Sequence, residues 1–472
     1  MDTHTRLRYD GFVQPFNRFT FDSYGFDPAT GKIALRYSLD DVIRFTETLT
    51  LPQSSTYSLE PTPSLDRALF ALHLIGGISY FKTCLPKTID IRSGSLTREQ
   101  AEFWNTVYEQ GLGEFFYKNK IDPKGRIRFP HTSTPRPPPP REEGGHPREM
   151  RLMVPVGGGK DSAVTIELLR KGGYDMTLFR VGGHPLIERF AEEARKPLLT
   201  VKRTLAPALF DLNAQGALNG HVPISAYLSF LAVVIGELQG FTHVVFSSER
   251  SANEGNVHVG SSMINHQWSK SITFERMLQD YLQTFVTGNV RFFSLLRPLS
   301  ELHIMQIFST YPQYFDRFTS CNKNWKIAKA TSDQLRVTGE KLQTQNSIGL
   351  WCNHCPKCAF TFALLSAFVP REQLLAIFGA DLFADATLLP LYRELLGLTG
   401  IKPFECVGTP EEVAAALLLA DERGEWGDAA VLHMFRTEAL DRFASADAII
   451  NALLLPSKDH AIPEEFLSVL PT

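Results

Sequence analysis

The chain has no hydrophobic run long enough to cross a bilayer, since its longest apolar stretch lies near Leu228–Ile235 and suits a buried helix. It has only six cysteines in 472 residues, which excludes a disulfide-rich secreted scaffold. Its formal net charge is −3, so no excess of basic residues draws it to nucleic acid or to an anionic membrane. Its polar N-terminus, Met1–Arg6, is not followed by the apolar segment of a signal peptide. These absences predict a cytoplasmic globular protein with two or three domains.

The sequence pattern divides the chain into four regions. Residues 1–133 carry short alternating strands, with a hairpin turn at Asp27–Lys32, and then helices, which predicts an N-terminal α+β domain. Residues 134–149 are rich in proline and predict an exposed linker, with a ligand for a proline-recognition domain as the alternative. Residues 150–340 predict an α/β domain, whose resemblance to ATP-binding PP-loop domains is given below, and residues 341–472 predict a cysteine cluster followed by a helical region.

From Arg151 the pattern alternates between short apolar strands and amphipathic helices. The predicted strands are Leu152–Val156, Met176–Val181, Leu198–Val201, His243–Ser247 and Phe292–Leu296, and the predicted helices are Ser162–Lys171, Pro185–Ala194, Ile224–Leu238 and Phe274–Phe285. This alternation predicts an α/β fold with a doubly wound parallel sheet. Because ligands of such sheets bind at the carboxyl ends of the strands, we expect the functional site there.

A glycine-rich turn follows the first predicted strand and opens onto the first helix. It consists of Gly157, Gly158, Gly159, Lys160, Asp161 and Ser162. Glycine lets the backbone approach an oxyanion, and the N–H groups and dipole at the start of a helix favour negative charge. Lys160 and Ser162 are further candidate phosphate ligands, whereas Asp161 is a candidate for orienting the loop, holding a metal ion or taking part in catalysis. A strand–helix turn without a ligand is the alternative.

The spacing of this turn matches neither the Walker loop nor the Rossmann fingerprint. The turn instead resembles the PP-loop of ATP pyrophosphatases, Ser-Gly-Gly-x-Asp-Ser, with Gly157 in place of the first serine. That resemblance implies that the loop binds ATP and that the protein splits it into AMP and pyrophosphate, usually to adenylate a substrate.

A group of closely spaced cysteines predicts a metal site. Its candidate ligands are Cys321, Cys352, Cys355 and Cys358. Three thiols within seven residues indicate metal or redox chemistry in a cytosolic protein, and four thiolates suit structural Zn²⁺. An iron–sulfur cluster and free buried cysteines are the alternatives. The set resembles the zinc site of PP-loop enzymes such as 7-cyano-7-deazaguanine synthase. Cys84 and Cys406 are isolated in the sequence and are predicted to be packing residues.

A polar segment, Ser248–Asn256, follows the predicted strand His243–Ser247 and should project at the same sheet edge as the glycine turn. Glu249 is a candidate catalytic base or magnesium ligand. Arg250 suits bidentate binding of a phosphate or carboxylate of the nucleotide or substrate, and Asn253 is a candidate substrate ligand. A solvated surface loop is the alternative.

His266 and Lys270 are four residues apart and would share one face if they lay on a helix. His266 is a candidate general acid or base, and Lys270 a candidate ligand for an anionic group of the substrate. A structural histidine is the alternative.

Beyond the loop, most of residues 10–360 resembles one family. The resemblance lies in four blocks: Phe16–Gly31, Val156–Ser162, Ser248–Asn256 and Leu350–Cys358. The chain resembles the MurL-type bacterial UDP-N-acetylmuramoyl-L-alanyl-L-glutamate epimerases, within the PP-loop superfamily. The resemblance implies an isomerase that uses ATP and Mg²⁺ to invert the terminal L-glutamate of this peptidoglycan precursor, with the UDP-muramoyl dipeptide as its partner and with no nucleic acid or membrane.

The implied chemistry joins the α-carboxylate of the glutamate to AMP. This removes the carboxylate charge, so the acyl carbon accepts enolate character and a side-chain base can take the Cα proton. The same loop would serve a PP-loop ligase, a tRNA-modifying thiolase or a non-catalytic nucleotide-binding regulator. A tRNA enzyme should show a basic face, and residues 1–150 carry no basic-aromatic stripe.

Overall fold

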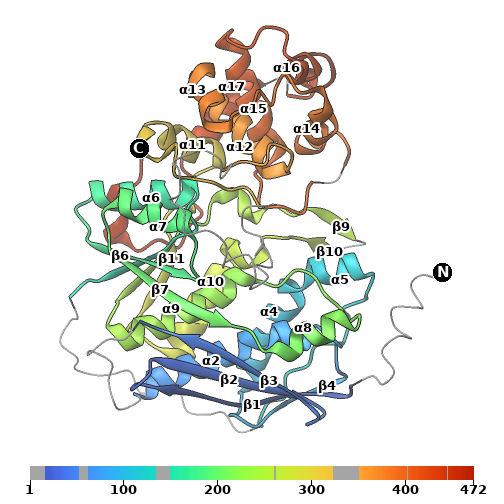
Figure 1. Ribbon diagram of the computed structural model, residues 1–472, viewed down its shortest axis with the longest axis vertical. Coiled ribbons are helices and arrows are strands. Elements are labelled where there is room, and N and C mark those ends of the chain that lie inside the picture. The colour runs from blue at the N-terminus through green and yellow to red at the C-terminus, as the bar shows by residue number, and fades with distance from the viewer. Residues whose placement is uncertain are drawn as a thin grey trace, which may run out of the picture.

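The computed structural model describes residues 16–471 except for 53–61, 134–148, 260–261, 323–349, 401 and 444. The predicted proline-rich linker therefore lies outside the described residues, apart from Glu149. A nine-stranded sheet forms the centre of the described chain, and a helical region covers one end of the molecule (Figure 1). No helix in these ranges combines the length and the apolar character needed to cross a membrane.

The sheet has the strand order β11-β8-β5-β6-β7-β3-β2-β1-β4. Its strands are β1 (Arg18–Asp27), β2 (Lys32–Leu39), β3 (Ile43–Thr50), β4 (Thr88–Ile91), β5 (Leu152–Pro155), β6 (Met176–Val181), β7 (Leu198–Thr204), β8 (His243–Phe246) and β11 (Arg291–Ser294). The neighbours β11, β8, β5, β6 and β7 are parallel, as predicted.

The sheet as a whole is mixed, which corrects the prediction of a wholly parallel sheet. Without the N-terminal strands, β7 would be an exposed edge of the parallel part of the sheet. β3 pairs with β7 in antiparallel register, with Thr48 opposite Thr204. The predicted hairpin β1–β2 is confirmed, with Asp27 opposite Lys32 across its turn. The N-terminal strands therefore continue the sheet that carries the glycine turn.

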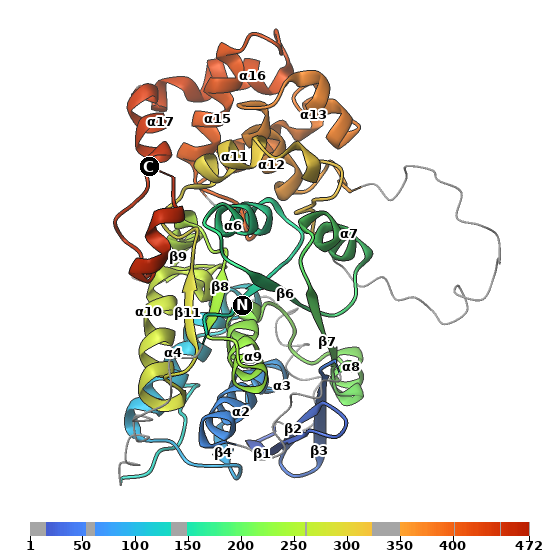
Figure 2. The same ribbon diagram turned by 90° about the vertical axis from the view of Figure 1, so that its left-hand side faces the viewer.

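Helices pack on both faces of the parallel strands, because the side chains of those strands alternate between two cores (Figure 2). In β5, Leu152 and Val154 enter one core and Met153 enters the other. The first core contains residues of α6 (Lys160–Lys171), α7 (Pro185–Ala194) and α11 (Glu301–Ser309). The second contains residues of α2 (Pro63–Gly76), α4 (Arg98–Gly111), α9 (Ile224–Gln239) and α10 (Ile272–Tyr281). Shorter helices are α3 (Ile78–Phe81), α5 (Gly113–Asn119) and α8 (Pro207–Ala214).

The C-terminal region is helical, as predicted, and lies on the α6 and α11 side of the sheet (Figure 1). It contains α12 (Pro356–Ser366), α13 (Arg371–Phe378), α14 (Leu389–Leu395), α15 (Pro410–Glu422), α16 (Ala430–Met434) and α17 (Ala446–Leu454). The apolar faces of α12 and α15 join the core that α6 and β5 begin. This continuous core fixes the loop before α15 relative to the carboxyl edge of the sheet.

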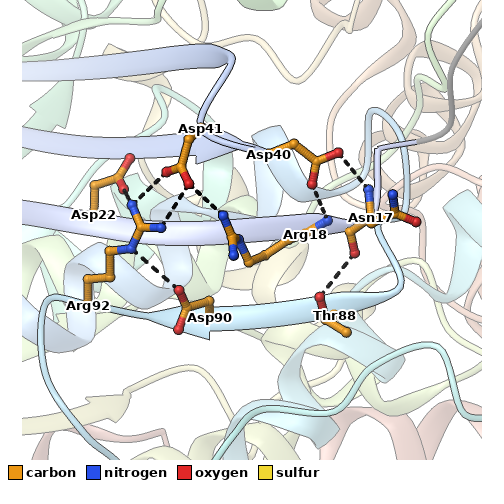
Figure 3. A network of polar contacts seen from close by, with 8 residues as sticks. All are labelled: Asn17, Arg18, Asp22, Asp40, Asp41, Thr88, Asp90 and Arg92. Carbon is orange, nitrogen blue, oxygen red and sulfur yellow. Dashed lines mark hydrogen bonds and ion pairs between the residues drawn. The ribbon is translucent and has the colours of Figure 1, made fainter.

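An exposed network of ion pairs and hydrogen bonds lies among the N-terminal strands, at the end of the sheet away from the C-terminal helical region (Figure 3). The turn between β2 and β3 places Asp40 and Asp41 at φ of 49° and 60°. Asp40 accepts from the main-chain N–H of Arg18 at 2.8 Å, and Asp41 accepts two bonds from Arg92, at 2.6 and 2.9 Å. The side-chain hydrogen bonds with Arg92 lower the pKa of Asp41 to about 2. The network ties β1, the β2–β3 turn and the end of β4 together at the surface.

Candidate active site

The glycine turn joins β5 to α6 at the carboxyl edge of the parallel strands. Gly158 has a φ of 73°, in the left-handed region that glycine adopts without strain. The Gly157 N–H donates to Ser162 Oγ at 3.2 Å, and the Thr319 N–H donates to Gly158 O at 3.1 Å. Helix α6 begins at Lys160 without a side-chain cap on its first N–H groups. The turn thus offers main-chain donors at a helix start, which is the requirement of an anion site.

Lys160 is buried and lies between two carboxylates rather than open to solvent. Its Nζ forms ion pairs with Asp161 and with Glu301 of α11. Burial alone would lower the pKa of Lys160, but these two carboxylates outweigh it and hold the pKa above its ordinary value. Lys160 was predicted to bind phosphate, and in this structure it pairs with the acidic residues of the site instead.

Glu301 is crowded by negative charge. Burial raises its pKa, against the opposing effect of Lys160. Asp161, Glu249 and Glu412 raise the pKa further, since each adds a carboxylate to the same region. Glu412 lies in the first turn of α15 and accepts from the Glu301 N–H at 2.8 Å. The site thus gathers more carboxylates than its nearest lysine can neutralise.

The segment after β8 reaches the glycine turn, as predicted. β8 lies directly beside β5 in parallel, and Thr165 Oγ1 of α6 donates to Ser247 Oγ at 2.8 Å. Glu249 is buried at this edge. It lies close enough to Lys270 to raise the pKa of that lysine, although burial acts in the opposite direction.

The other two predicted ligands of this segment contact protein groups. Arg250 donates from Nη1 to Leu455 O at 3.3 Å and from Nη2 to Leu453 O at 3.4 Å. Asn253 Oδ1 accepts from the Ile272 N–H at 2.8 Å, beside the start of α10. These contacts hold the segment against α17 and α10.

The four predicted metal ligands come together although a long segment separates the first from the others. Their sulfur atoms all lie within 4.8 Å of one another; they belong to Cys321, Cys352, Cys355 and Cys358. Cys358 Sγ lies 3.7 Å from Cys352 Sγ and 3.5 Å from Cys355 Sγ. Thiolates bound tetrahedrally to one zinc ion at about 2.3 Å would be about 3.8 Å apart, so the set fits a single structural metal ion such as zinc.

The cysteine site adjoins the glycine turn. Thr319, whose N–H bonds Gly158, also accepts from the Cys321 N–H at 3.1 Å and donates from Oγ1 to Leu350 O at 2.6 Å. A metal ion on the four sulfurs would therefore hold both chain segments that support the turn.

Cys406 lies in a cluster of ionisable side chains, which corrects its prediction as a packing residue. It is half-buried, in the loop before α15, and lies close enough to His266 and Lys270 for its charge to interact with both. His266 Nδ1 bonds the Glu114 carboxylate of α5. The His221 ring lies tilted against that of His266, with ring centroids 4.5 Å apart.

His266 and Lys270 do not share a helix face, contrary to the expectation from their spacing. His266 precedes the short 3₁₀ helix η2 (Trp268–Lys270), because its N–H is taken by Asn256 Oδ1 at 2.8 Å. Both side chains nevertheless reach Cys406.

The cluster favours a thiolate beside a charged imidazole. Burial would raise the pKa of Cys406, but Lys270, Lys357 and His266 lower it to about 5. Burial would lower the pKa of His266, but Cys406 and Glu114 raise it to about 9. Near neutral pH the pair is therefore Cys406 thiolate and His266 imidazolium, which is a proton-transfer arrangement.

Comparison with known proteins gives the chain a family. The profile of the MurL N-terminal domain matches residues 12–295, and that of the MurL C-terminal domain matches residues 317–449. This chain belongs to the MurL family. A MurL relative from Xanthomonas oryzae pv. oryzae is 38% identical over 450 residues, covering 94% of this chain and 95% of the relative. Another, from Salinispora tropica, is 39% identical over 467 residues, covering 97% and 96%. Both are named UDP-N-acetyl-alpha-D-muramoyl-L-alanyl-L-glutamate epimerase.

The two MurL domains both contribute to the candidate site. The N-terminal match contains the glycine turn, Glu114 and His266, and the C-terminal match contains the cysteine site and Cys406. Sequence reasoning missed Glu114, His221, Glu301 and Cys406. No local pattern marks them, because each meets its partners only through the tertiary fold.

Proposed function

We propose that this protein converts the terminal L-glutamate of UDP-N-acetylmuramoyl-L-alanyl-L-glutamate to D-glutamate in peptidoglycan synthesis. ATP activates the glutamate α-carboxylate as an acyl-adenylate at a PP-loop, and AMP and pyrophosphate are released. The observation that carries this proposal is the placement of two sites at one sheet edge: an uncapped glycine turn and a buried acid–base cluster. The names of the relatives, at 38–39% identity over nearly their whole length, give the substrate.

Activation explains why the fold needs both sites. The Cα proton beside a carboxylate is too weakly acidic for a side-chain base, because the enolate would carry two negative charges. General acid–base help supplies only about 10²–10⁴-fold, so adenylation must supply most of the acidity. Water then hydrolyses the adenylate and frees the product.

The glycine turn has room for the nucleotide phosphates. Gly157 is exposed, and no described atom lies within 4 Å of the position that a Cβ would take there. Ser162 Oγ lies at the turn and the first N–H groups of α6 point the same way. We assign nucleotide binding to the predicted residues Gly157–Ser162.

The acidic residues fit a magnesium ion. Asp161 and Glu249 both lie near Glu301, and a divalent cation would relieve the repulsion that adds to burial in raising the pKa of Glu301. Bound there with ATP, magnesium would neutralise phosphate charge as the pyrophosphate leaves. We assign metal binding to Asp161 and Glu249. Lys160 would keep Glu301 and Asp161 in place.

The test is to incubate the protein with ATP, Mg²⁺ and the UDP-muramoyl dipeptide and to follow AMP and the chirality of the glutamate. We expect AMP and D-glutamate from the wild-type protein. Gly158→Val strains a φ of 73° and should reduce both products together, by about 10²-fold or more. D-glutamate without AMP would overturn the ATP-dependent mechanism. AMP with an amide or thiol product would favour a ligase or thiolase instead.

A further inference from the structure

Three parts of the chain that are far apart in sequence meet around one sulfur atom. α5 contributes Glu114, the segment just before η2 contributes His266, η2 contributes Lys270, and the loop before α15 contributes Cys406. A thiol held for packing alone would be surrounded by apolar side chains. Here a histidine and a lysine lie close enough to interact with its charge, and the histidine bonds a carboxylate.

Asn256 fixes the approach of these segments. Its Oδ1 accepts from the His266 N–H at 2.8 Å, and its Nδ2 donates to Pro403 O at 2.7 Å. Its main-chain O also accepts from the Lys402 N–H at 3.3 Å. One buried amide therefore sets the spacing between the histidine and the loop that carries Cys406.

Lys270 connects this cluster to the glycine turn. Its ammonium is close enough to interact with Cys406, with Glu249 and with Asp161 of the turn. A substrate activated at the glycine turn would thus place its acyl group within reach of the thiol. Lys270 would neutralise charge that develops on the acyl oxygen.

We propose that Cys406 is the base that removes the Cα proton of the activated glutamate, with His266 and Glu114 as its positioning residues and Lys270 as the cation that faces the enolate. This inference rests on the proposed function and deepens it by naming the group that transfers the proton. A thiolate suits the task because it is already deprotonated near neutral pH and lies half-buried beside cations that stabilise its charge.

The proton balance of the step is simple. The Cα–H bond breaks, its electron pair moves to the acyl oxygen as an enolate, and the proton passes to the Cys406 sulfur. Solvent supplies a proton to the opposite face of Cα while the enolate returns its electron pair to that carbon. The Cys406 thiol then loses its proton to solvent, which restores the thiolate–imidazolium pair.

A cation at this cluster is the competing interpretation, because Glu114, His221 and His266 lie close enough together to hold one. The neighbouring charges argue against it. Lys118 already forms an ion pair with Glu114, and the charges of Lys118 and Lys270 add to burial in lowering the pKa of His221. A cation would have to displace or deprotonate these groups.

The deciding experiment separates activation from proton transfer. Wild-type protein and Cys406→Ala are incubated in deuterated water with ATP, Mg²⁺ and the UDP-muramoyl dipeptide, and AMP and Cα deuterium are measured. We expect the variant to keep forming AMP and to lose Cα deuterium by at least about 10²-fold. Cys84→Ala, which alters a half-buried cysteine away from this site, is the matched control and should keep both.

The outcomes distinguish the two proposals. If the wild-type protein forms neither AMP nor D-glutamate, the proposed function fails. If the wild-type protein works and Cys406→Ala exchanges within about twofold of it, only the assignment of Cys406 fails. Loss of AMP together with exchange, in a variant that keeps the wild-type circular dichroism, would place the thiol in activation and also overturn the assignment.

A second readout tests the positioning role of His266. The ultraviolet absorbance of the thiolate, taken as wild type minus Cys406→Ala, should titrate with a midpoint near pH 5. The charged or titratable groups around the thiol are His266, Lys270, Lys357, Glu405, Glu114, Lys118 and His221. In a His266→Gln background the midpoint should move upward, because the imidazolium no longer favours the thiolate. A midpoint that stays in place would overturn the role of His266.

Discussion

Two buried carboxylates of this protein have opposite surroundings. Glu47 of β3 accepts from Arg203 Nε at 2.8 Å and from Arg203 Nη2 at 3.1 Å. It also accepts from the hydroxyls of Tyr80 at 2.9 Å and Tyr227 at 2.6 Å. Glu301 of α11 pairs with Lys160, but its other near neighbours include Asp161, Glu249 and Glu412.

The difference separates a structural carboxylate from a functional one. Donors fill both oxygens of Glu47, so its charge is compensated in the folded protein alone. Glu301 lies among three other carboxylates, and the cations near it, Lys160 and Lys402, are fewer, so a bound ligand or cation would add compensation. Buried charge by itself therefore does not mark a site, whereas buried charge of one sign without enough partners does.

The largest expected effect on stability comes from replacing Glu47, the carboxylate whose two oxygens both accept hydrogen bonds. Glu47→Ala leaves the Arg203 guanidinium buried without its anion, and the free energy of unfolding should fall by about 3–5 kcal/mol. Denaturant unfolding measures this. Tyr227→Phe, which removes one donor only, should cost about 1 kcal/mol. A Glu47→Ala protein of wild-type stability would show that Arg203 does not need Glu47 to compensate its buried charge.

The next largest expected effect is that of the cysteine site on ATP binding at the glycine turn. Cys358→Ser, or removal of the metal ion by a chelator, should loosen the Thr319 segment that bonds Gly158. We expect metal loss together with about tenfold weaker ATP binding, which corresponds to about 1.4 kcal/mol. Metal analysis and calorimetric titration with ATP give the two values. Unchanged ATP affinity in metal-free protein would show that the sites are independent.

Glu301→Gln should change how the stability of the protein depends on pH. Between the ordinary pKa of 4.5 and the higher value in the folded protein, the folded chain keeps a proton that the unfolded chain has released. The stability of the wild-type protein should therefore fall as pH rises through that window. The glutamine variant should lose this fall while AMP formation decreases. Thermal unfolding at several pH values tests the sign, and an unchanged slope in the variant would contradict it.

The exposed network of Figure 3 should show the smallest effect. Asp41 and Arg92 are well paired but open to solvent and salt, so Arg92→Ala should leave the free energy of unfolding unchanged within error. Denaturant unfolding in low and high salt measures it. A loss as large as that of Glu47→Ala would mean that burial does not decide the strength of these pairs.

The sequence predicted the elements of the parallel sheet well because their patterns are local. Met176–Val181 and Pro185–Ala194 match β6 and α7 residue for residue. The glycine turn and the cysteine set were also visible, since their chemistry lies in short motifs. The antiparallel join of β3 to β7 was not, because strand pairing across 150 residues leaves no local trace. The surroundings of Cys406 were missed for the same reason, since Glu114, His266 and Lys270 come near it only through the fold.

The most direct test of the account is the dependence of Cα proton exchange on ATP. The wild-type protein is incubated with the UDP-muramoyl dipeptide and Mg²⁺ in deuterated water, with and without ATP, and deuterium at the glutamate Cα is measured by mass spectrometry. We expect exchange only when ATP is present, because the thiolate cannot deprotonate the free acid. Equal exchange without ATP would contradict it, since the acid–base cluster would then act without activation at the glycine turn.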